Sequence, residues 1–153
     1  PHAPQATHAP PAPRPQDLPQ PAESGLGQTP VPGAVLREVL MTLILNAAEA
    51  MGGAGEIHIE TLRVESRWHP RRLEIRVKDH GLGIPDEDFC RLFRPGFTTE
   101  PGGSGLGLYL ARRELRRHGG DVRAERAAGG GAVFLVRVPL SGRVHGQAVV
   151  AGG

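Results

Sequence analysis

The sequence predicts an α+β fold: a two-layer sandwich of a mixed, mostly antiparallel sheet with helices packed on one face. Two stretches, residues 35–51 and 106–118, carry apolar side chains at helical spacing. Four shorter stretches have the pattern of strands, and they span residues 56–64, 71–79, 121–127 and 132–140. The order of helix, two strands, loop, helix and two strands is typical of such a sandwich.

The composition limits the classes of function. With 153 residues, of which 39% are hydrophobic and only 4% aromatic, the chain can form one domain with an aliphatic core. The formal net charge is only +2 and acids are interleaved with the arginines, which argues against nucleic-acid binding. No apolar run is long enough to span a membrane, so we expect no direct membrane contact from this segment. Cys90 is the only cysteine, which fits a reducing compartment.

Three segments of the chain differ in composition. Residues 1–30 are rich in proline and poor in aliphatic residues, which predicts a disordered linker. Residues 31–141 hold all the predicted helices and strands and form the domain, and residues 142–153 predict a flexible tail. The chain begins at Pro1 with neither a methionine nor a secretory signal, so we expect a fragment of a longer protein.

The first predicted helix carries one thin polar stripe on an otherwise apolar surface. The stripe consists of residues three or four positions apart: Glu38, Thr42, Asn46 and Glu49. Gly52 and Gly53 follow as a stop signal. Asn46 has two interpretations, a buried amide that is hydrogen-bonded to a neighbouring strand, or a neutral oxygen ligand for a hard cation such as Mg²⁺.

The next stretches predict a hairpin followed by a long loop. Residues 71–79 alternate cleanly, with Leu73, Ile75 and Val77 on one face and charged residues on the other. Residues 81–105 are rich in glycine, proline and acids, and they predict a loop with one short helical turn at 86–93. A loop of this length in a small domain is usually functional.

Two glycine-rich segments lie at the ends of predicted elements. DHGLGIP, residues 79–85, puts Asp79 at a strand end, where its carboxylate can accept a hydrogen bond from an exocyclic amine. GGSGLGL, residues 102–108, opens a helix, where bare N–H groups and the helix dipole favour phosphate. In isolation the second segment is equally compatible with a plain glycine-rich turn, and a tight turn with a solvated aspartate is the commoner explanation of an isolated Asp-x-Gly such as the first. No P-loop lysine and no βαβ unit accompanies them, which excludes a P-loop and a dinucleotide fingerprint.

Taken in order, these segments resemble the ATP-binding catalytic (HATPase_c) domain of bacterial sensor histidine kinases, in the GHKL ATPase superfamily. REVLMTLILNAAEAM, residues 37–51, looks like the family's N box, and DHGLGIP looks like its first glycine box. LFRPGFTTEPGG, residues 92–103, looks like the F box and lid, and GSGLGLYLARRELRRHGG, residues 103–120, looks like the second glycine box with its helix. The resemblance covers residues 31–140 and implies the same fold. The two lid phenylalanines and the GLGL…HGG ending favour histidine kinases over the gyrase, mismatch-repair, chaperone and anti-sigma-factor branches.

The resemblance implies a site for ATP and Mg²⁺. Asn46 would coordinate the Mg²⁺ that bridges the phosphates, and Asp79 would accept a hydrogen bond from the adenine amino group. Thr42 and Asn46 are the candidate catalytic residues. The implied ATP-binding set is Asn46, Glu49, Asp79, Gly81, Gly83, Ile84, Phe93, Phe97, Thr98, Thr99, Gly103, Ser104, Gly105, Leu106, Gly107 and Leu108. In this set the phenylalanines would anchor a mobile lid, and the last three glycines would offer backbone donors to the phosphates.

Three residues depart from the family's pattern. Thr42 stands where a second asparagine is usual, and its oxygen has a shorter reach. Glu100 stands where lysine is frequent, and its carboxylate would repel phosphate unless it points to solvent. Ala132 replaces a threonine that supports the adenine-reading aspartate. We therefore expect ATP binding and leave the effect of these residues on catalysis open.

The implied function is that of the catalytic part of a two-component sensor histidine kinase, which donates the ATP γ-phosphate to a histidine on a separate dimerisation domain. None of the seven histidines lies in a helical H-E-x-x-x-P-like setting, so the chain should not autophosphorylate alone. The implied partners are that dimerisation domain and a response-regulator receiver domain, and the expected location is the cytoplasm, including the cytoplasmic part of a membrane-bound sensor. The alternatives are a degenerate nucleotide-binding regulatory module and a stand-alone GHKL ATPase.

Two further features are explained more simply by structure than by function. The second predicted helix carries four arginines, Arg112, Arg113, Arg116 and Arg117. The interleaved Glu114 favours a solvated face over a docking site for the missing helical domain or the response regulator. Cys90 is expected to be a turn residue without chemistry.

Overall fold

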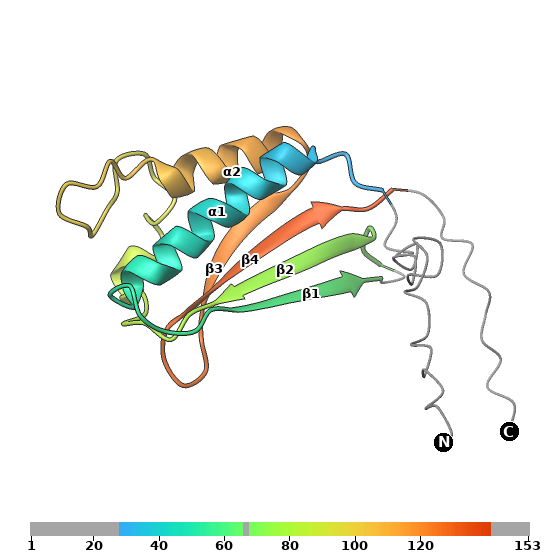
Figure 1. Ribbon diagram of the computed structural model, residues 1–153. Helices are drawn as coiled ribbons and strands as arrows, with labels where there is room; N and C mark the ends of the chain where they lie inside the picture. The colour runs from blue at the N-terminus through green and yellow to red at the C-terminus, as the bar shows by residue number, and fades with distance from the viewer. Residues whose placement is uncertain (1–27, 66–67, 142–153) are drawn as a thin grey trace, which may run out of the picture.

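The computed structural model describes residues 28–65 and 68–141 (Figure 1). Most of the predicted linker and the whole predicted tail, residues 142–153, lie outside these ranges. The last linker residues do not: Gln28 forms an antiparallel bridge with Ser141, in which each residue's backbone N–H donates to the carbonyl of the other. The described fold therefore begins slightly before the predicted boundary at residue 31.

The elements follow the predicted order. They are α1 (Gly33–Ala50), β1 (His58–Val64), β2 (Arg72–Lys78), the short 3₁₀ helix η2 (Asp86–Asp88), α2 (Gly107–Arg117), β3 (Asp121–Arg126) and β4 (Ala132–Pro139). Gly53 donates its N–H to the Ala48 carbonyl at the end of α1, and Gly119 takes a φ of +81° just after α2. These are the expected helix stops. No described helix has both the length and the apolar character needed to cross a membrane.

The four described strands form one sheet in the order β1-β2-β4-β3. Each neighbouring pair is antiparallel, for example with Val77 of β2 opposite Phe134 of β4 and Val122 of β3 opposite Val136. β2 and β3 run in the same direction, but β4 lies between them, so the described strands contain no parallel pair. The α+β sandwich is confirmed, and the sheet, expected to be mostly antiparallel, is antiparallel at every pair of the described strands.

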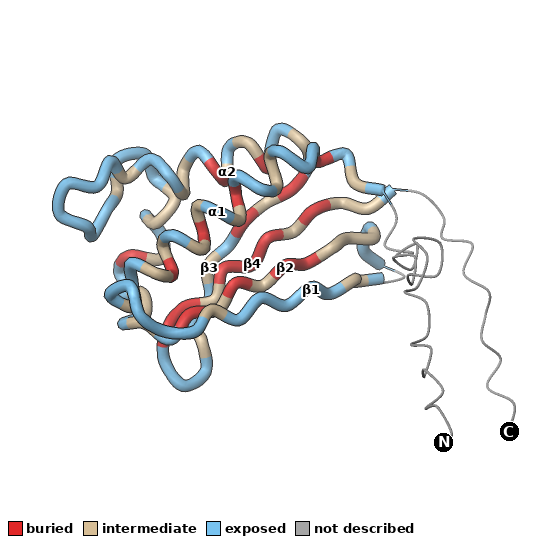
Figure 2. The backbone as a smooth tube through the Cα atoms, viewed as in Figure 1, coloured by how far each residue is buried: buried red, intermediate tan, exposed pale blue. Residues whose placement is uncertain are grey.

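Both helices cover the same face of the sheet, α1 next to α2 (Figure 1). The buried residues lie between this helical layer and β2, β4 and β3, while β1 is largely exposed (Figure 2). The core is aliphatic apart from one aromatic side chain, as the composition predicted, and includes Leu43, Val77, Leu115, Val122, Phe134 and Val136. This packing brings the end of α1, the end of β2, the start of β4 and the start of α2 to one end of the molecule.

The opposite face of the sheet carries a buried carboxylate. Glu74 of β2 is only 5% exposed, and its Oε1 accepts hydrogen bonds from Arg72 Nε (2.8 Å) and Arg137 Nε (3.0 Å). Burial by itself raises the pKa of Glu74, but the two guanidinium groups outweigh it and hold the pKa below its ordinary value. The charged residues on this face of β2 and β4 therefore pair with one another, and no described helix covers them.

Candidate functional site

A pocket of about 590 Å³ opens at the end of the molecule where α1 and β2 end and β4 and α2 begin. This volume lies within the usual range of small-molecule sites. Its lining comes from α1, the loop after β2, η2, the loop that leads to α2, the first turn of α2 and the start of β4. Segments that are far apart in the sequence therefore meet around one cavity.

Most of the predicted site residues line this pocket. They are Asn46, Glu49, Asp79, Gly83, Ile84, Phe97, Thr98, Thr99, Gly103, Ser104, Gly105, Gly107 and Leu108. Four predicted residues do not line it: Thr42, Gly81, Phe93 and Leu106. The lining also includes residues that the site prediction left out, namely Ala50, Leu82, Pro85, Asp88, Leu92, Glu100, Pro101, Gly102, Ala132 and Phe134.

Asn46 lies on the side of α1 that faces the pocket. Its side chain is half-buried rather than buried among strands, and within the described part of the chain it makes no hydrogen bond. The structure therefore does not support the interpretation as a satisfied buried amide. Glu49, three residues further along the same helix, is exposed and also lines the pocket, so an amide oxygen and a carboxylate face the same cavity.

Thr42 is directed elsewhere. Its hydroxyl donates to the Glu38 carbonyl one turn earlier in α1, at 3.0 Å. Its methyl group meets α2, since a Cβ placed on Gly107 would lie 3.3 Å from Thr42 Cγ2. The hydroxyl hydrogen is thus used within the helix, and the side chain lies outside the pocket lining, where α1 and α2 approach each other closely. This position outside the pocket lining argues against a catalytic role for Thr42.

Asp79 is 2% exposed at the end of β2. Its Oδ1 accepts the backbone N–H of Gly81 (2.9 Å) and that of Ala132 (3.2 Å), and its own N–H donates to the Ala132 carbonyl (3.0 Å). Oδ2 accepts no hydrogen bond from the described residues. A carboxylate that is anchored through one oxygen and lines a pocket has an acceptor left for a ligand.

This geometry explains how alanine can stand at position 132, where the family usually has threonine. The support for Asp79 comes from the Ala132 backbone, which any residue at the start of β4 supplies. The neighbouring Gly131 was missed by the sequence analysis, although it is the last glycine of the run at 129–131. Its φ is +82°, and a Cβ there would lie 2.1 Å from the Asp79 carbonyl oxygen. Gly131 therefore allows the hairpin of β3 and β4 to close directly onto Asp79.

The first turn of α2 borders the pocket through Gly105, Gly107 and Leu108. No side chain caps its N-terminus, and its first turn contains no acidic residue. The first N–H groups of a helix have no partner within the helix, and the helix dipole favours an anion there. Gly105 is required by a close approach, because a Cβ on it would lie 2.4 Å from the Gly96 carbonyl carbon.

The loop between η2 and α2 is connected through charged and aromatic side chains. Asp88 is buried, and its Oδ1 accepts Arg91 Nη2 at 2.7 Å. The Arg91 guanidinium lies 4.8 Å from the centre of the Phe97 ring, which lines the pocket. Phe93 instead packs against the core, below the Arg112 guanidinium at 4.8 Å. Phe97 thus lies on the pocket side of the loop, while Phe93 attaches the loop to the core.

The arginines of α2 pair within the domain. Arg112 Nε and Arg116 Nε donate to Asp121 Oδ1 at 2.9 and 3.1 Å, while Arg117 Nη1 donates to Glu114 at 3.2 Å. Partial burial by itself raises the pKa of Asp121, but these hydrogen bonds outweigh it and hold the pKa below its ordinary value. This pairing favours the interpretation as a surface face over that of a docking site. Cys90 is exposed in the turn after η2, near the Glu87 carbonyl.

Asp121→Asn should lower the free energy of unfolding by about 1–2 kcal/mol at pH 7, because it removes charge-assisted bonds that connect α2 to β3. A depressed pKa stabilises the fold above the unfolded-state value, and this contribution disappears as the pH falls through the folded-state value. Urea denaturation from pH 7 down to acid should therefore show wild type and variant converging below about pH 4. Glu125→Gln, an exposed change on the same strand, serves as the control. Equal loss at all pH values would contradict the prediction.

The fold and the pocket define the class: an α+β sandwich domain with a glycine-rich ligand site at one end of its sheet. A family model described as histidine kinase-, DNA gyrase B- and HSP90-like ATPase matches residues 33–142. The chain belongs to this family of ATPases.

Curated relatives include the signal transduction histidine-protein kinase AtoS of Escherichia coli (strain K12) and sporulation kinase C of Bacillus subtilis (strain 168). The chain is 34% identical to AtoS over 107 residues, or 70% of this chain and 17% of AtoS. It is 37% identical to sporulation kinase C over 105 residues, or 69% of this chain and 23% of that protein. The chain thus spans about a fifth of the length of these relatives.

Solved structures show the same fold. The catalytic domain of histidine kinase ThkA matches with a TM-score of 0.60 and 32% identity, over 69% of this chain and 66% of that chain. Full-length ShkA in complex with AMPPNP matches with a TM-score of 0.61 and 26% identity, over 72% of this chain and 22% of that chain. The predicted resemblance and fold are confirmed.

Proposed function

We propose that this chain is the Mg-ATP-binding catalytic domain of a two-component sensor histidine kinase, which donates the γ-phosphate of ATP to a histidine on a separate dimerisation domain. The observation that carries the proposal is the convergence of Asn46, Asp79 and the uncapped start of α2 on one pocket. These groups come from different elements around the cavity and offer a base acceptor, a metal ligand and backbone donors for phosphate. Family membership and the similarity to ShkA, solved with AMPPNP, support the choice of ligand.

In this proposal each group has one task. Asp79 Oδ2 accepts the adenine amino group, while Gly81 and Ala132 hold the carboxylate through Oδ1. Gly83, with a φ of +77°, keeps the backbone beside the base free of a side chain. The first N–H groups of α2 receive the phosphates. Catalysis by such a site consists mainly of positioning and charge stabilisation, since phosphoryl transfer needs little covalent chemistry from the protein.

The residues present fit a magnesium ion. Asn46 and Glu49 offer hard oxygen donors to the pocket, which Mg²⁺ prefers. The described residues contain no group of three His, Cys, Asp or Glu that could hold a metal by themselves. That donor set suits an ion that keeps waters and phosphate oxygens in its shell. Bound Mg²⁺ would neutralise phosphate charge during transfer.

The partners in this proposal are the dimerisation domain that carries the acceptor histidine and the receiver domain of a response regulator. The names of the relatives as sensor and sporulation kinases support this assignment. The proposed location is the cytoplasm, where such a kinase finds ATP and its regulator. Neither nucleic acid nor a membrane surface is a proposed ligand of this segment.

Asn46→Ala should remove most of the Mg²⁺-dependent gain in ATP affinity, by about tenfold or more, because the amide is the proposed protein ligand of the ion. The measurement is calorimetric titration of the 153-residue chain with ATP in Mg²⁺ and in EDTA. Thr42→Ala, on the same helix but outside the pocket lining, is the control and should keep the wild-type ratio.

The same titration separates the alternatives. A degenerate regulatory module is favoured if wild type and Asn46→Ala both show no Mg²⁺ dependence, and that result would refute the catalytic proposal. Steady ATP hydrolysis by the chain without any histidine substrate would instead point to a stand-alone ATPase.

A further inference from the structure

The pocket that receives the nucleotide is acidic. Its lining includes four carboxylates, Glu49, Asp79, Asp88 and Glu100. Among the described residues that line it there is no lysine, arginine or histidine. Every side chain with a full charge among the described lining residues therefore has the same sign as a triphosphate.

The four carboxylates differ in what compensates them. Asp88 is paired with Arg91, and Asp79 is held by two backbone N–H groups at the base end of the site. Glu49 and Glu100 take part in no ion pair within the described ranges. Both residues are exposed and line the pocket, and no ion-pair partner in the described ranges cancels their charge.

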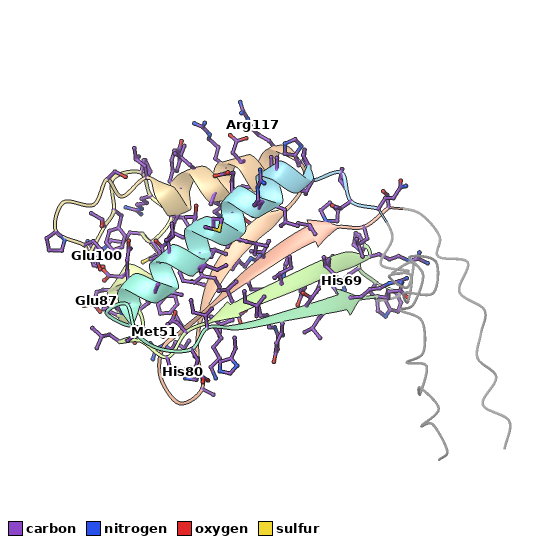
Figure 3. All side chains as sticks on the ribbon, in the orientation of Figure 1. Met51, His69, His80, Glu87, Glu100 and Arg117 are labelled. Carbon is purple, nitrogen blue, oxygen red and sulfur yellow. The ribbon has the colours of Figure 1, made fainter. Side chains whose placement is uncertain are left out.

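Glu100 is exposed, and a tight turn holds its backbone. Its N–H donates to Thr98 Oγ1 at 3.0 Å, and its carbonyl accepts the Gly103 N–H at 3.1 Å. A Cβ on Gly103 would lie 2.7 Å from Thr98 Oγ1 and 3.3 Å from Glu100 Cβ, so the turn is closely packed. The turn leads directly into Ser104 and the start of α2, the proposed phosphate end of the site. Figure 3 shows Glu100 on this loop, at the end of the molecule where α1 ends.

Resting on the proposed function, we propose that Glu100 is a specificity-determining residue that makes the pocket select the metal complex of the nucleotide against the free nucleotide. Free ATP carries roughly twice the negative charge of its magnesium complex, so a carboxylate beside the phosphates repels it more strongly. The donors that remain are the neutral N–H groups of α2 and the hydroxyls of Thr98, Thr99 and Ser104. These groups orient phosphate but cannot neutralise it.

The experiment uses the 153-residue chain and three probes: ATP with EDTA, ATP with excess Mg²⁺, and adenosine. Affinity is measured by calorimetry for wild type, Glu100→Gln and Glu100→Lys. We expect Glu100→Lys to raise the affinity for free ATP by about tenfold or more, Glu100→Gln to raise it less, and the gain for Mg-ATP to be smaller. The affinity for adenosine should not change, because it carries no phosphate.

Glu87 offers a matched control. It is an exposed acid on η2 at the same end of the molecule, but it does not line the pocket (Figure 3). Glu87→Gln and Glu87→Lys should leave the ratio of Mg-ATP to free ATP affinity close to that of wild type. In about 0.5 M salt the gain from Glu100→Lys should shrink, because it is electrostatic and the site is open to solvent.

Two results would overturn the inference alone. One is a wild-type preference for Mg-ATP over free ATP that Glu100→Gln and Glu100→Lys leave unchanged while adenosine binding is intact. The other is an equal change of the ratio in the Glu87 and Glu100 series, which would reflect overall charge. A wild-type chain that binds none of the three probes would instead overturn the proposed function, and this inference with it.

Discussion

Asp79→Asn should lower the affinity for ATP by about a hundredfold or more and leave the fold intact. The variant keeps an oxygen that can accept the N–H groups of Gly81 and Ala132, so the local backbone has no reason to move. The second atom changes from an acceptor to an N–H₂ donor. Two donors, the new amide and the adenine amino group, would then face each other in a buried site, where an unpaired polar group costs about 1–3 kcal/mol.

The measurement is calorimetric titration with Mg-ATP, accompanied by denaturant unfolding. Unfolding free energy should stay within about 1 kcal/mol of wild type, since the anchoring bonds persist. Titration with inosine triphosphate is a more specific test. This nucleotide has a carbonyl in place of the adenine amino group, and the carbonyl can accept a hydrogen bond from the new amide. The variant should therefore discriminate less against it than wild type does. Unchanged ATP affinity would remove Asp79 from the site.

Gly131→Ala should reduce ATP affinity by more than about tenfold and also destabilise the fold by about 2 kcal/mol. The new Cβ would lie 2.1 Å from the Asp79 carbonyl oxygen and 3.0 Å from Asp79 Oδ1. Both contacts involve groups fixed by the pairing of β2 with β4, so the hairpin or Asp79 has to shift. The φ of +82° adds strain to any residue with a side chain.

Gly130→Ala is a matched control on the same hairpin. Gly130 also has a positive φ, +102°, but a Cβ there meets nothing within 4 Å. It should lose about 1 kcal/mol of stability from strain and keep its ATP affinity. Thermal unfolding and calorimetry measure both quantities. Equal losses of affinity in the two variants would mean that hairpin flexibility, rather than contact with Asp79, controls the site.

The elements were predictable because their signals are local. Helical spacing on α1, alternation along β2 and the glycine stops each depend on neighbours within a few residues. The register of β4 between β2 and β3 depends on pairing across more than fifty residues, as between Val77 and Phe134. No local pattern encodes that pairing, which is why a mostly antiparallel sheet could be predicted but not the order and register of its strands.

The site shows the same division. Asn46, Asp79 and the second glycine segment could be predicted as candidates from sequence, because each is an unusual polar or glycine residue near a helix or strand end, and they line one pocket. Thr42, a predicted catalytic candidate, does not line the pocket, and its spacing along the helix could not show that its methyl group would face Gly107 of α2. Gly131 and Asp88 were missed because their importance comes from contacts with Asp79 and Arg91 in the folded chain.

By itself the sequence determined the order of the elements, the aliphatic core, the family resemblance and the chemical types that could meet a nucleotide. Only the tertiary structure decided which of them share a cavity, that Thr42 does not line it, and that Glu100 does. The physical reason is that residue type and short-range period are properties of a segment. A pocket, in contrast, is a set of distances between segments, and these distances exist only when the helices pack on the sheet.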